Sequence, residues 1–306
     1  MNWILRIISA VIVLAIIAAL VRLIPAHLQV RTVTPPLPKD EALLALLESP
    51  NGPTKLSYIL TSSQQLERGQ ISHISIVVEW QDGKRFLIDT GMDHQEAKNF
   101  AALLQKMDSK AGEATVTGNI SELLGSEIDS ISGLGYTHLH IDHTQGTKNF
   151  CKARGKGAVV LQTTSQQQLH NFNTTEGAVL VANSCLQKGY FTSGATNNLY
   201  KSPQFPGIAA FELGGHTPGS TLWAVAFKEK VLLFSGDITN DAASLHQDMP
   251  KSWAYSYLFV PENTARTAEI RKWLHALDQS DAFSVIVSHD LDNTQRYLKE
   301  FMKRND

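Results

Sequence analysis

Residues 136–143 read YTHLHIDH, and four of these eight side chains are of kinds that bind metal ions. In extended backbone, residues two apart project to the same side, so His138 and His140 can hold one ion together. Asp142 and His143 come where the chain has to turn, and they can point to a second place nearby. With 11 histidines in 306 residues, chance produces H-x-H-x-D-H in fewer than about one chain in a thousand. The pattern therefore predicts a metal site without thiolates.

Three further donors each follow an apolar segment that is typical of a buried strand. Any one of them alone is more often structural, but four such strand-end sites in one chain predict a common centre. The three donors, with their local sequences, are His216 in GGHTPGS (214–220), Asp237 in FSGD (234–237) and His289 in VSHD (287–290).

The composition excludes several classes of protein. Hydrophobic residues make up 43% of the chain and charged residues 18%, which is typical of a folded globular protein. Lys and Arg number 27 against 29 Asp and Glu, which argues against nucleic-acid binding through a basic surface. Two cysteines are too few for a disulfide scaffold or a thiolate zinc cluster. Cys151 and Cys185 are left either as a pair or as two free thiols. No G-x-S-x-G motif supports a serine hydrolase.

The N-terminal segment is almost wholly apolar from residue 3 to residue 24. Its uncharged part, 7–21, is flanked by Arg6 and Arg22 and would rise roughly 22 Å as a helix. Because arginines can snorkel, the wider segment approaches the roughly 30 Å core of a bilayer. A buried core helix is disfavoured because the run has no polar face. A cleaved signal peptide is a weaker fit, since residues 24–26 (IPA) make a poor cleavage site.

We therefore expect a membrane anchor, or failing that a signal segment, over residues 1–25. Residues 26–53 are expected to form a proline-containing linker with a short helix at 40–48. The short N-terminal tail favours export of the rest of the chain. The expected location is the cell envelope: anchored in the inner membrane with the catalytic domain outside the cytoplasm, or in the periplasm if cleaved.

Residues 54–306 alternate between strand groups and helices, which predicts an α/β domain in which two sheets pack together with helices outside. A hairpin turn is expected at Asp82-Gly83 and a helix cap at Asn263. The expected strands are 56–60, 74–79, 85–88, 158–161, 208–213, 221–227, 231–234 and 284–287, and the expected helices are 94–107, 264–277 and 292–302.

The motifs HLHIDH, GGHTPGS, SGD and VSHD, in that order, resemble those of the metallo-β-lactamase superfamily of metallohydrolases. FLIDTG at residues 86–91 is similar to an early strand-end motif of the same family. The resemblance covers roughly residues 55–306. It implies a four-layer αββα sandwich, with the N-terminal hydrophobic helix outside the fold.

The resemblance also implies a set of site residues. Asp89 would orient a metal-bound imidazole, and Asp142 would also act in catalysis by orienting the nucleophile and accepting its proton. The expected cofactors are two Zn²⁺ ions, with Fe or Mn as possible replacements. The implied ligands are His138, His140 and His216 for the first metal, Asp142, His143 and His289 for the second, and Asp237 for both.

The implied function is a dinuclear zinc hydrolase in which a metal-bridging hydroxide attacks a small ester, lactone, thioester or amide. A phosphodiesterase is one alternative, and a mononuclear iron oxidoreductase of the sulfur dioxygenase type is another. A diiron oxidoreductase would carry Glu in place of His140. Some lactonases place a tyrosine shortly after the bridging aspartate, whereas Asp237 is followed by Ile-Thr-Asn. A non-catalytic binding module is disfavoured because no ligand is lost.

The expected partners are a small-molecule substrate and, through the N-terminal helix, a membrane; no nucleic acid is expected, and the oligomeric state is left open. His94 could reach the mouth of the site. The aromatic-rich segment 240–257 could form a pocket wall or pack under a long loop; it contains His246, Met249, Trp253, Tyr255 and Tyr257. Surface or structural roles are expected for His27, His73, His170 and His275.

Overall fold

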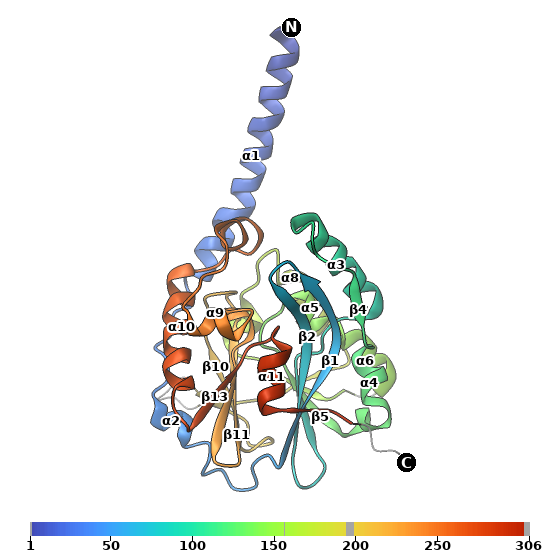
Figure 1. Ribbon diagram of the computed structural model, residues 1–306, viewed down its shortest axis with the longest axis vertical. Coiled ribbons are helices and arrows are strands. Elements are labelled where there is room, and N and C mark those ends of the chain that lie inside the picture. Colours follow the sequence, from blue (N-terminus) through green and yellow to red (C-terminus); the bar gives the residue numbers. More distant parts are fainter. Residues whose placement is uncertain (1, 156, 194–198, 303–306) are drawn as a thin grey trace.

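The computed structural model describes residues 2–155, 157–193 and 199–302, so the last four residues of the expected domain lie outside the described part. Two sheets face each other in the middle of the domain and helices cover their outer faces (Figure 1). The predicted αββα architecture, with an apolar N-terminal helix projecting from it, is confirmed.

The first sheet has eight strands, most of them from the first half of the chain. Strands β3, β5, β6 and β7 run parallel to one another, and β4 pairs with β1 on the edge of β1 that faces away from β2. In spatial order the strands are β14 (Lys299–Glu300), β1 (Lys55–Leu66), β2 (Gly69–Glu79), β3 (Arg85–Ile88), β5 (Ile131–Gly135), β6 (Val159–Leu161) and β7 (Gln187–Lys188), with β4 (Ala114–Val116) off this path.

The second sheet has six strands and is antiparallel except for the parallel pair β12 and β13. In spatial order they are β13 (Phe283–Ile286), β12 (Lys230–Phe234), β11 (Thr221–Phe227), β10 (Ile208–Glu212), β9 (Leu199–Lys201) and β8 (Thr192–Ser193).

The helices are mostly short and lie between the strands along the chain. They are α1 (Asn2–Val30), α2 (Asp40–Leu44), α3 (His94–Met107), α4 (Ile120–Leu124), η1 (Gly125–Ser130), α5 (Ile141–Thr144), α6 (Thr147–Arg154), α7 (Thr164–Gln168), α8 (Thr175–Ala182), η2 (Gly236–Ile238), α9 (Ala242–His246), η3 (Tyr255–Phe259), α10 (Thr264–Asp278) and α11 (Leu291–Tyr297).

Large aromatic side chains fill the space between the two sheets. Trp223 and Phe205 lie fully buried against Phe86. Glycine is required at Gly133 and Gly135 of β5, because a Cβ at either position would overlap the Phe205 or the Trp223 ring. This close approach fixes the distance between the sheets next to the strand ends that carry the site.

Two boundaries differ from the sequence-based expectation. The helix expected at 292–302 ends at Tyr297, and residues 299–300 form β14, which pairs with β1. Leu298 is buried, and the N–H of Phe301 donates to the carbonyl of Tyr58, so strand pairing replaces the last helical turns. The β1–β2 hairpin is also longer than expected, because the polar residues 61–64 are buried and paired rather than exposed at a turn.

Helix α1 continues through Pro25 to Val30, five residues past the expected end of the anchor segment 1–25. Ala26 and Val30 are buried against the domain, and this packing holds the last turn in place. Leu43 and Leu46 pack into the second sheet's core, so the segment 26–53 runs over the domain surface. Cys151 and Cys185, whose pairing the sequence left open, form a disulfide.

Among the described residues, one helix is long and apolar enough to cross a membrane, at Trp3–Val30. None of its most hydrophobic window is buried inside the protein. Figure 1 shows α1 projecting from the domain, which is compatible with either a membrane anchor or a signal sequence.

Candidate metal centre

The carboxyl ends of the strands meet at one edge of the sandwich, and the predicted donors follow these ends. Asp89 follows β3, and His138 comes shortly after β5 in the same sheet. Asp237 and His289 follow the parallel strands β12 and β13 of the other sheet. Loops from both sheets therefore converge on one place, and the seven expected ligands are brought together there.

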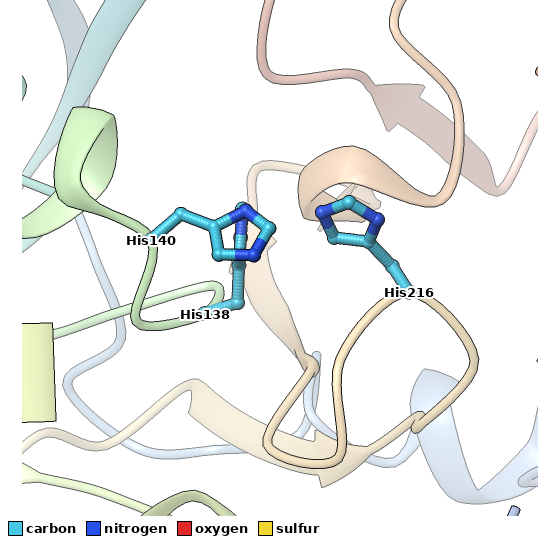
Figure 2. A group of neighbouring side chains, drawn as sticks. All are labelled: His138, His140 and His216. Atoms are coloured by element: carbon cyan, nitrogen blue, oxygen red, sulfur yellow. The ribbon is translucent and has the colours of Figure 1, made fainter. Parts of the chain in front are cut away.

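The first group consists of His138, His140 and His216, whose ligand atoms lie within 4.8 Å of one another. Figure 2 shows the His216 ring facing the other two. The His138 Nε2 and His140 Nδ1 atoms are 2.9 Å apart. The Nε2 atoms of His140 and His216 are buried without any hydrogen-bond partner. Since buried polar atoms are rarely left unpaired, these nitrogens fit a cation between the three rings.

The second group consists of Asp142, His143, Asp237 and His289, again with ligand atoms within 4.8 Å of one another. The His289 Nε2 lies 3.0 Å from Asp237 Oδ2 and 3.5 Å from Asp142 Oδ2. The His143 Nε2 lies 3.4 Å from an oxygen of each carboxylate. Two imidazoles and two carboxylates thus surround one point, a donor set that suits Zn²⁺ and also Fe or Mn.

Asp237 belongs to the second group and also lies next to the first. Its Oδ2 atom lies 3.8 Å from His216 Nε2 and 4.0 Å from His138 Nε2, in addition to the contact with His289. Gly236 directly before it has φ +60°, and a Cβ there would press on Thr137. The tight turn after β12 therefore places one carboxylate between the two sets of imidazoles.

The electrostatics of the site also fit cations. Burial lowers the pKa of His138, and lowers that of His140 to about 3, so both rings are neutral at pH 7 and able to bind a metal. Burial alone would raise the pKa of Asp237, but His289 and His143 hold it well below its usual range. Burial alone would lower the pKa of His143, but the carboxylates of Asp142 and Asp89 hold it well above the usual value. The same carboxylates that favour a proton on His143 would favour a metal cation bound to its neutral ring in place of that proton.

Asp89 holds the His143 ring from outside the group. The His143 Nδ1 lies 2.9 Å from Asp89 Oδ2. The backbone N–H and the hydroxyl of Thr137 each donate to the Asp89 carboxylate at 2.7 Å. With Nδ1 engaged, Nε2 of His143 is left to face the second group. His289 is held in the same way, because its Nδ1 lies 2.9 Å from the carbonyl oxygen of Ser72.

Glu262 holds the His216 ring, and the sequence interpretation missed it. Its Oε1 lies 2.6 Å from His216 Nδ1, and the Ser256 hydroxyl donates to Oε2 at 2.5 Å. The Lys251 ammonium donates to Oε1 at 3.2 Å and to the Asp237 carbonyl at 2.5 Å. Although burial opposes it, Lys251 and His216 lower the pKa of Glu262 to about 2. Glu262 belongs to no motif, so only the search for a partner of His216 could have found it.

His73 is the second side chain that the sequence interpretation missed. It was expected to have a surface or structural role, but it is buried in β2 beside the second group. Its Nδ1 lies 3.0 Å from the Ser62 hydroxyl, and its Nε2 lies 3.9 Å from Asp142 Oδ2. Its ring meets the His289 ring edge to face. Burial lowers the pKa of His73 to about 3.

The other candidates near the site have mixed outcomes. His94 is exposed and pairs with Glu122, and His246 pairs with Asp278. Tyr255 does reach the centre, since its ring lies parallel to His216 with centroids 6.5 Å apart. Segment 240–257 thus contributes Tyr255 to the surroundings of the metal centre, and its Met249 lines a neighbouring groove.

That groove has a volume of about 550 Å³ and reaches the second group at His289. One side is the tip of the β1–β2 hairpin, at residues 66–71, and the other is the segment from Asn240 to Pro250. Leu66, Ile71 and Met249 contribute apolar surface to it. Its size is typical of a small-molecule site.

An αββα sandwich with two groups of histidine and aspartate side chains at its strand ends is typical of a metal-binding protein. Residues 68–179, which include HLHIDH, match the family model described as the metallo-beta-lactamase superfamily. This match confirms the predicted resemblance to that superfamily over the matched part of the chain. No curated protein sequence gives a significant match to the chain.

Solved structures of this fold include several hydrolases. Bacillus thuringiensis AiiA, solved with N-decanoyl-L-homoserine at its active site, is 15% identical; the match covers 82% of this chain and 98% of AiiA, with a TM-score of 0.59. AidC, a dizinc quorum-quenching lactonase, is 14% identical over 79% of this chain and 91% of its own, with a TM-score of 0.51. The hydrolase AbOPH is 15% identical over 80% and 92%, with a TM-score of 0.54. At these identities the likeness establishes the shared fold.

Proposed function

We propose that this protein is a dinuclear metal-dependent hydrolase, with zinc as its natural metal, that acts on a small ester, lactone, thioester or amide. The observation that carries the proposal is the position of Asp237, whose carboxylate lies close to the buried imidazoles of both groups. Three of these imidazoles, those of His140, His143 and His216, have an Nε2 atom without a hydrogen-bond partner. The match of residues 68–179 to the metallo-beta-lactamase superfamily model and the hydrolases that share the fold support the same chemistry.

The proposed ligands keep the expected division. His138, His140 and His216 would hold one ion and Asp142, His143 and His289 the other, with Asp237 reaching both. A pair of divalent cations would supply Lewis acidity and lower the pKa of a water to near neutrality. The chain itself fixes the geometry, because Asp89 and Glu262 hold the Nδ1 side of two imidazoles.

Asp142 is the proposed catalytic residue. Its Oδ2 faces His143, His289 and His73 at 3.4 to 3.9 Å, so the carboxylate lies where a nucleophilic water would be oriented. Neighbouring histidines hold the pKa of Asp142 low against the effect of burial, so the group is ionised at neutral pH and can accept a hydrogen bond from the water that it would orient.

The location proposed for the enzyme is the cell envelope, with residues 1–25 as an inner-membrane anchor and 54–306 as a catalytic domain outside the cytoplasm. Helix α1 supports the anchor. The Cys151–Cys185 disulfide supports export, because disulfides persist mainly in oxidising compartments. If α1 is cleaved as a signal segment, the domain would be periplasmic.

The test is metal analysis of the purified full chain, followed by a panel of chromogenic esters, lactones, phosphodiesters and β-lactams. We expect about two zinc ions per chain and turnover of an ester or lactone. The Asp142→Ala variant should lose turnover while keeping the fold by circular dichroism. A single iron per chain without zinc would instead favour the oxidoreductase alternative, and exclusive turnover of phosphodiesters would favour the phosphodiesterase.

A further inference from the structure

Large apolar side chains are exposed on the segment that walls the metal centre. Trp253 is 66% exposed, Leu258 48% and Phe259 50%. We call these three side chains the loop patch. They lie on or next to η3, between the groove residue Met249 and the start of α10. Clustered exposed apolar side chains of this size mark interaction surfaces.

The base of α1 docks onto the same segment. The His27 Nε2 lies 3.1 Å from the carbonyl oxygen of Tyr257, and the two rings are 5.5 Å apart. Tyr257 in turn stacks on Trp253. The Arg22 guanidinium lies 4.1 Å above the ring of Phe172, and Asn173 next to it donates to the carbonyl of Phe259. The base of the helix and the segment that carries the loop patch are therefore packed together.

This docking sets the height of a membrane relative to the patch. A helix needs about 20 residues to cross the hydrocarbon core, so residues 3–22 suffice and Arg22 would lie at the boundary. Arg22 contacts Phe172 of the domain, and the adjacent Asn173 is hydrogen-bonded to Phe259 of the loop patch. Tryptophan and other aromatic side chains are typical of this interfacial depth.

The patch is also continuous with the metal centre. Tyr255, between Trp253 and Leu258, lies parallel to the His216 ring. Lys251 and Ser256 bind Glu262, which holds His216. The groove that reaches His289 is lined on this side by Met249 and Pro250. The segment that carries the patch thus also contributes to the groove and to the support of His216.

We propose that the loop patch inserts into the bilayer interface that α1 spans, and that the substrate is a bilayer-resident amphiphile with a long acyl chain. Its ester or lactone group would reach the metal centre through the groove while the chain stays among the lipids. Hydrolysis would add one water across the acyl C–O bond and give a carboxylic acid and a hydroxyl group. The substrate part of this inference rests on the proposed hydrolase function.

The first test measures depth and does not depend on catalysis. The full chain is placed in nanodiscs of phosphatidylethanolamine and phosphatidylglycerol, with one nitroxide-labelled cysteine at a time. Both native cysteines are in the disulfide, so an introduced thiol can be labelled alone. Leu258→Cys tests the patch. Glu229→Cys is the control, because β12 runs from that turn toward Asp237 and the turn is thus at the far end of the strands.

We expect the label at 258 to be accessible to oxygen and protected from a water-soluble nickel chelate, with the reverse at 229. A label at 258 that is as accessible to nickel as the label at 229 would overturn the proposal.

The second test compares long-chain with short-chain esters in the same nanodiscs. The triple variant W253S/L258S/F259S should lower the ratio of long-chain to short-chain kcat/KM by about tenfold or more, because the apolar contact with the bilayer is lost. Tyr297→Ser is the matched control: Tyr297 is exposed beside Lys228 and Glu229, and its loss should leave the ratio unchanged. An unchanged ratio in the triple variant would overturn the substrate assignment.

The two proposals fail in different ways. If no ester is hydrolysed but the label at 258 is immersed, the hydrolase proposal fails and the membrane contact stands. If soluble esters are hydrolysed and the label at 258 is in water, the hydrolase stands and the membrane contact is wrong.

Discussion

The two halves of the metal centre are held by different kinds of structure. On one side Asp89 holds His143, and the Asp89 carboxylate is itself fixed by Thr137. Asp89 and Thr137 follow the neighbouring parallel strands β3 and β5. On the other side Glu262 holds His216, and Glu262 is fixed by Lys251 and Ser256.

The difference is that the first support is built on the sheet and the second on a loop. The segment that carries Lys251 and Ser256 also contacts α1 through Tyr257. A sheet edge is rigid because its hydrogen bonds and the aromatic layer beneath it fix the backbone. A loop is fixed only by what it packs against. The side of the site that contains His216 can therefore respond to what α1 and the loop patch contact. The side that contains His143 should not respond in this way.

The largest effect should come from the residue that joins the halves. Asp237→Asn removes the charge of a carboxylate that lies within 4.0 Å of imidazoles of both groups, so zinc content should fall toward zero and turnover should be lost. Asp142→Asn leaves the three-histidine group intact, so about one zinc per chain should remain. Metal content by mass spectrometry of the purified variants measures both.

The matched control for these variants is Asp281→Asn, which changes an exposed carboxylate and should keep full metal content. Equal metal loss in Asp142→Asn and Asp237→Asn would show that the halves do not bind independently, and would contradict the comparison.

The next effect compares the two supporting carboxylates. Asp89→Asn and Glu262→Gln should each weaken zinc binding by about 10–100-fold, since each removes the acceptor behind a ligand imidazole. Only Asp89→Asn should also destabilise the metal-free fold, by about 1–3 kcal/mol, because it disturbs two hydrogen bonds between strand ends. After the loss of Glu262, Lys251 is only partly buried and still reaches the Asp237 carbonyl. Zinc competition titrations and urea unfolding of the metal-free variants measure the two quantities.

If both variants lose the same free energy of unfolding, the loop is as integral to the fold as the sheet edge. The asymmetry proposed between the two halves would then be wrong.

What could be predicted from the sequence follows the same division. His138, Asp237 and His289 come shortly after apolar strands. Because the direction of a strand fixes where its carboxyl end lies, the sequence alone predicts the edge of the sheet at which these side chains meet. Asp89 also follows a strand, but its role was implied by the family resemblance and not by its position. Glu262 stands in a long connection whose path depends on packing with α1 and α10, so no local pattern indicates what it faces. His73 was missed because β2 is buried on both faces from Ser72 to Val78, and alternation gives no signal there.

The smallest effect on zinc affinity should come from Lys251→Met, because Lys251 acts on His216 only through Glu262. The ammonium donates to Glu262, but His216 and Ser256 would still hold that carboxylate in place. Zinc affinity should fall less than in Glu262→Gln, by less than about tenfold. Lys272→Met, at an exposed position of α10, is the control for loss of one positive charge. If Lys251→Met weakens zinc as much as Glu262→Gln, then the ammonium, and with it the loop's own packing, sets the position of His216. The loop-held half would then depend on the α1 contact more strongly than its hydrogen bonds alone indicate.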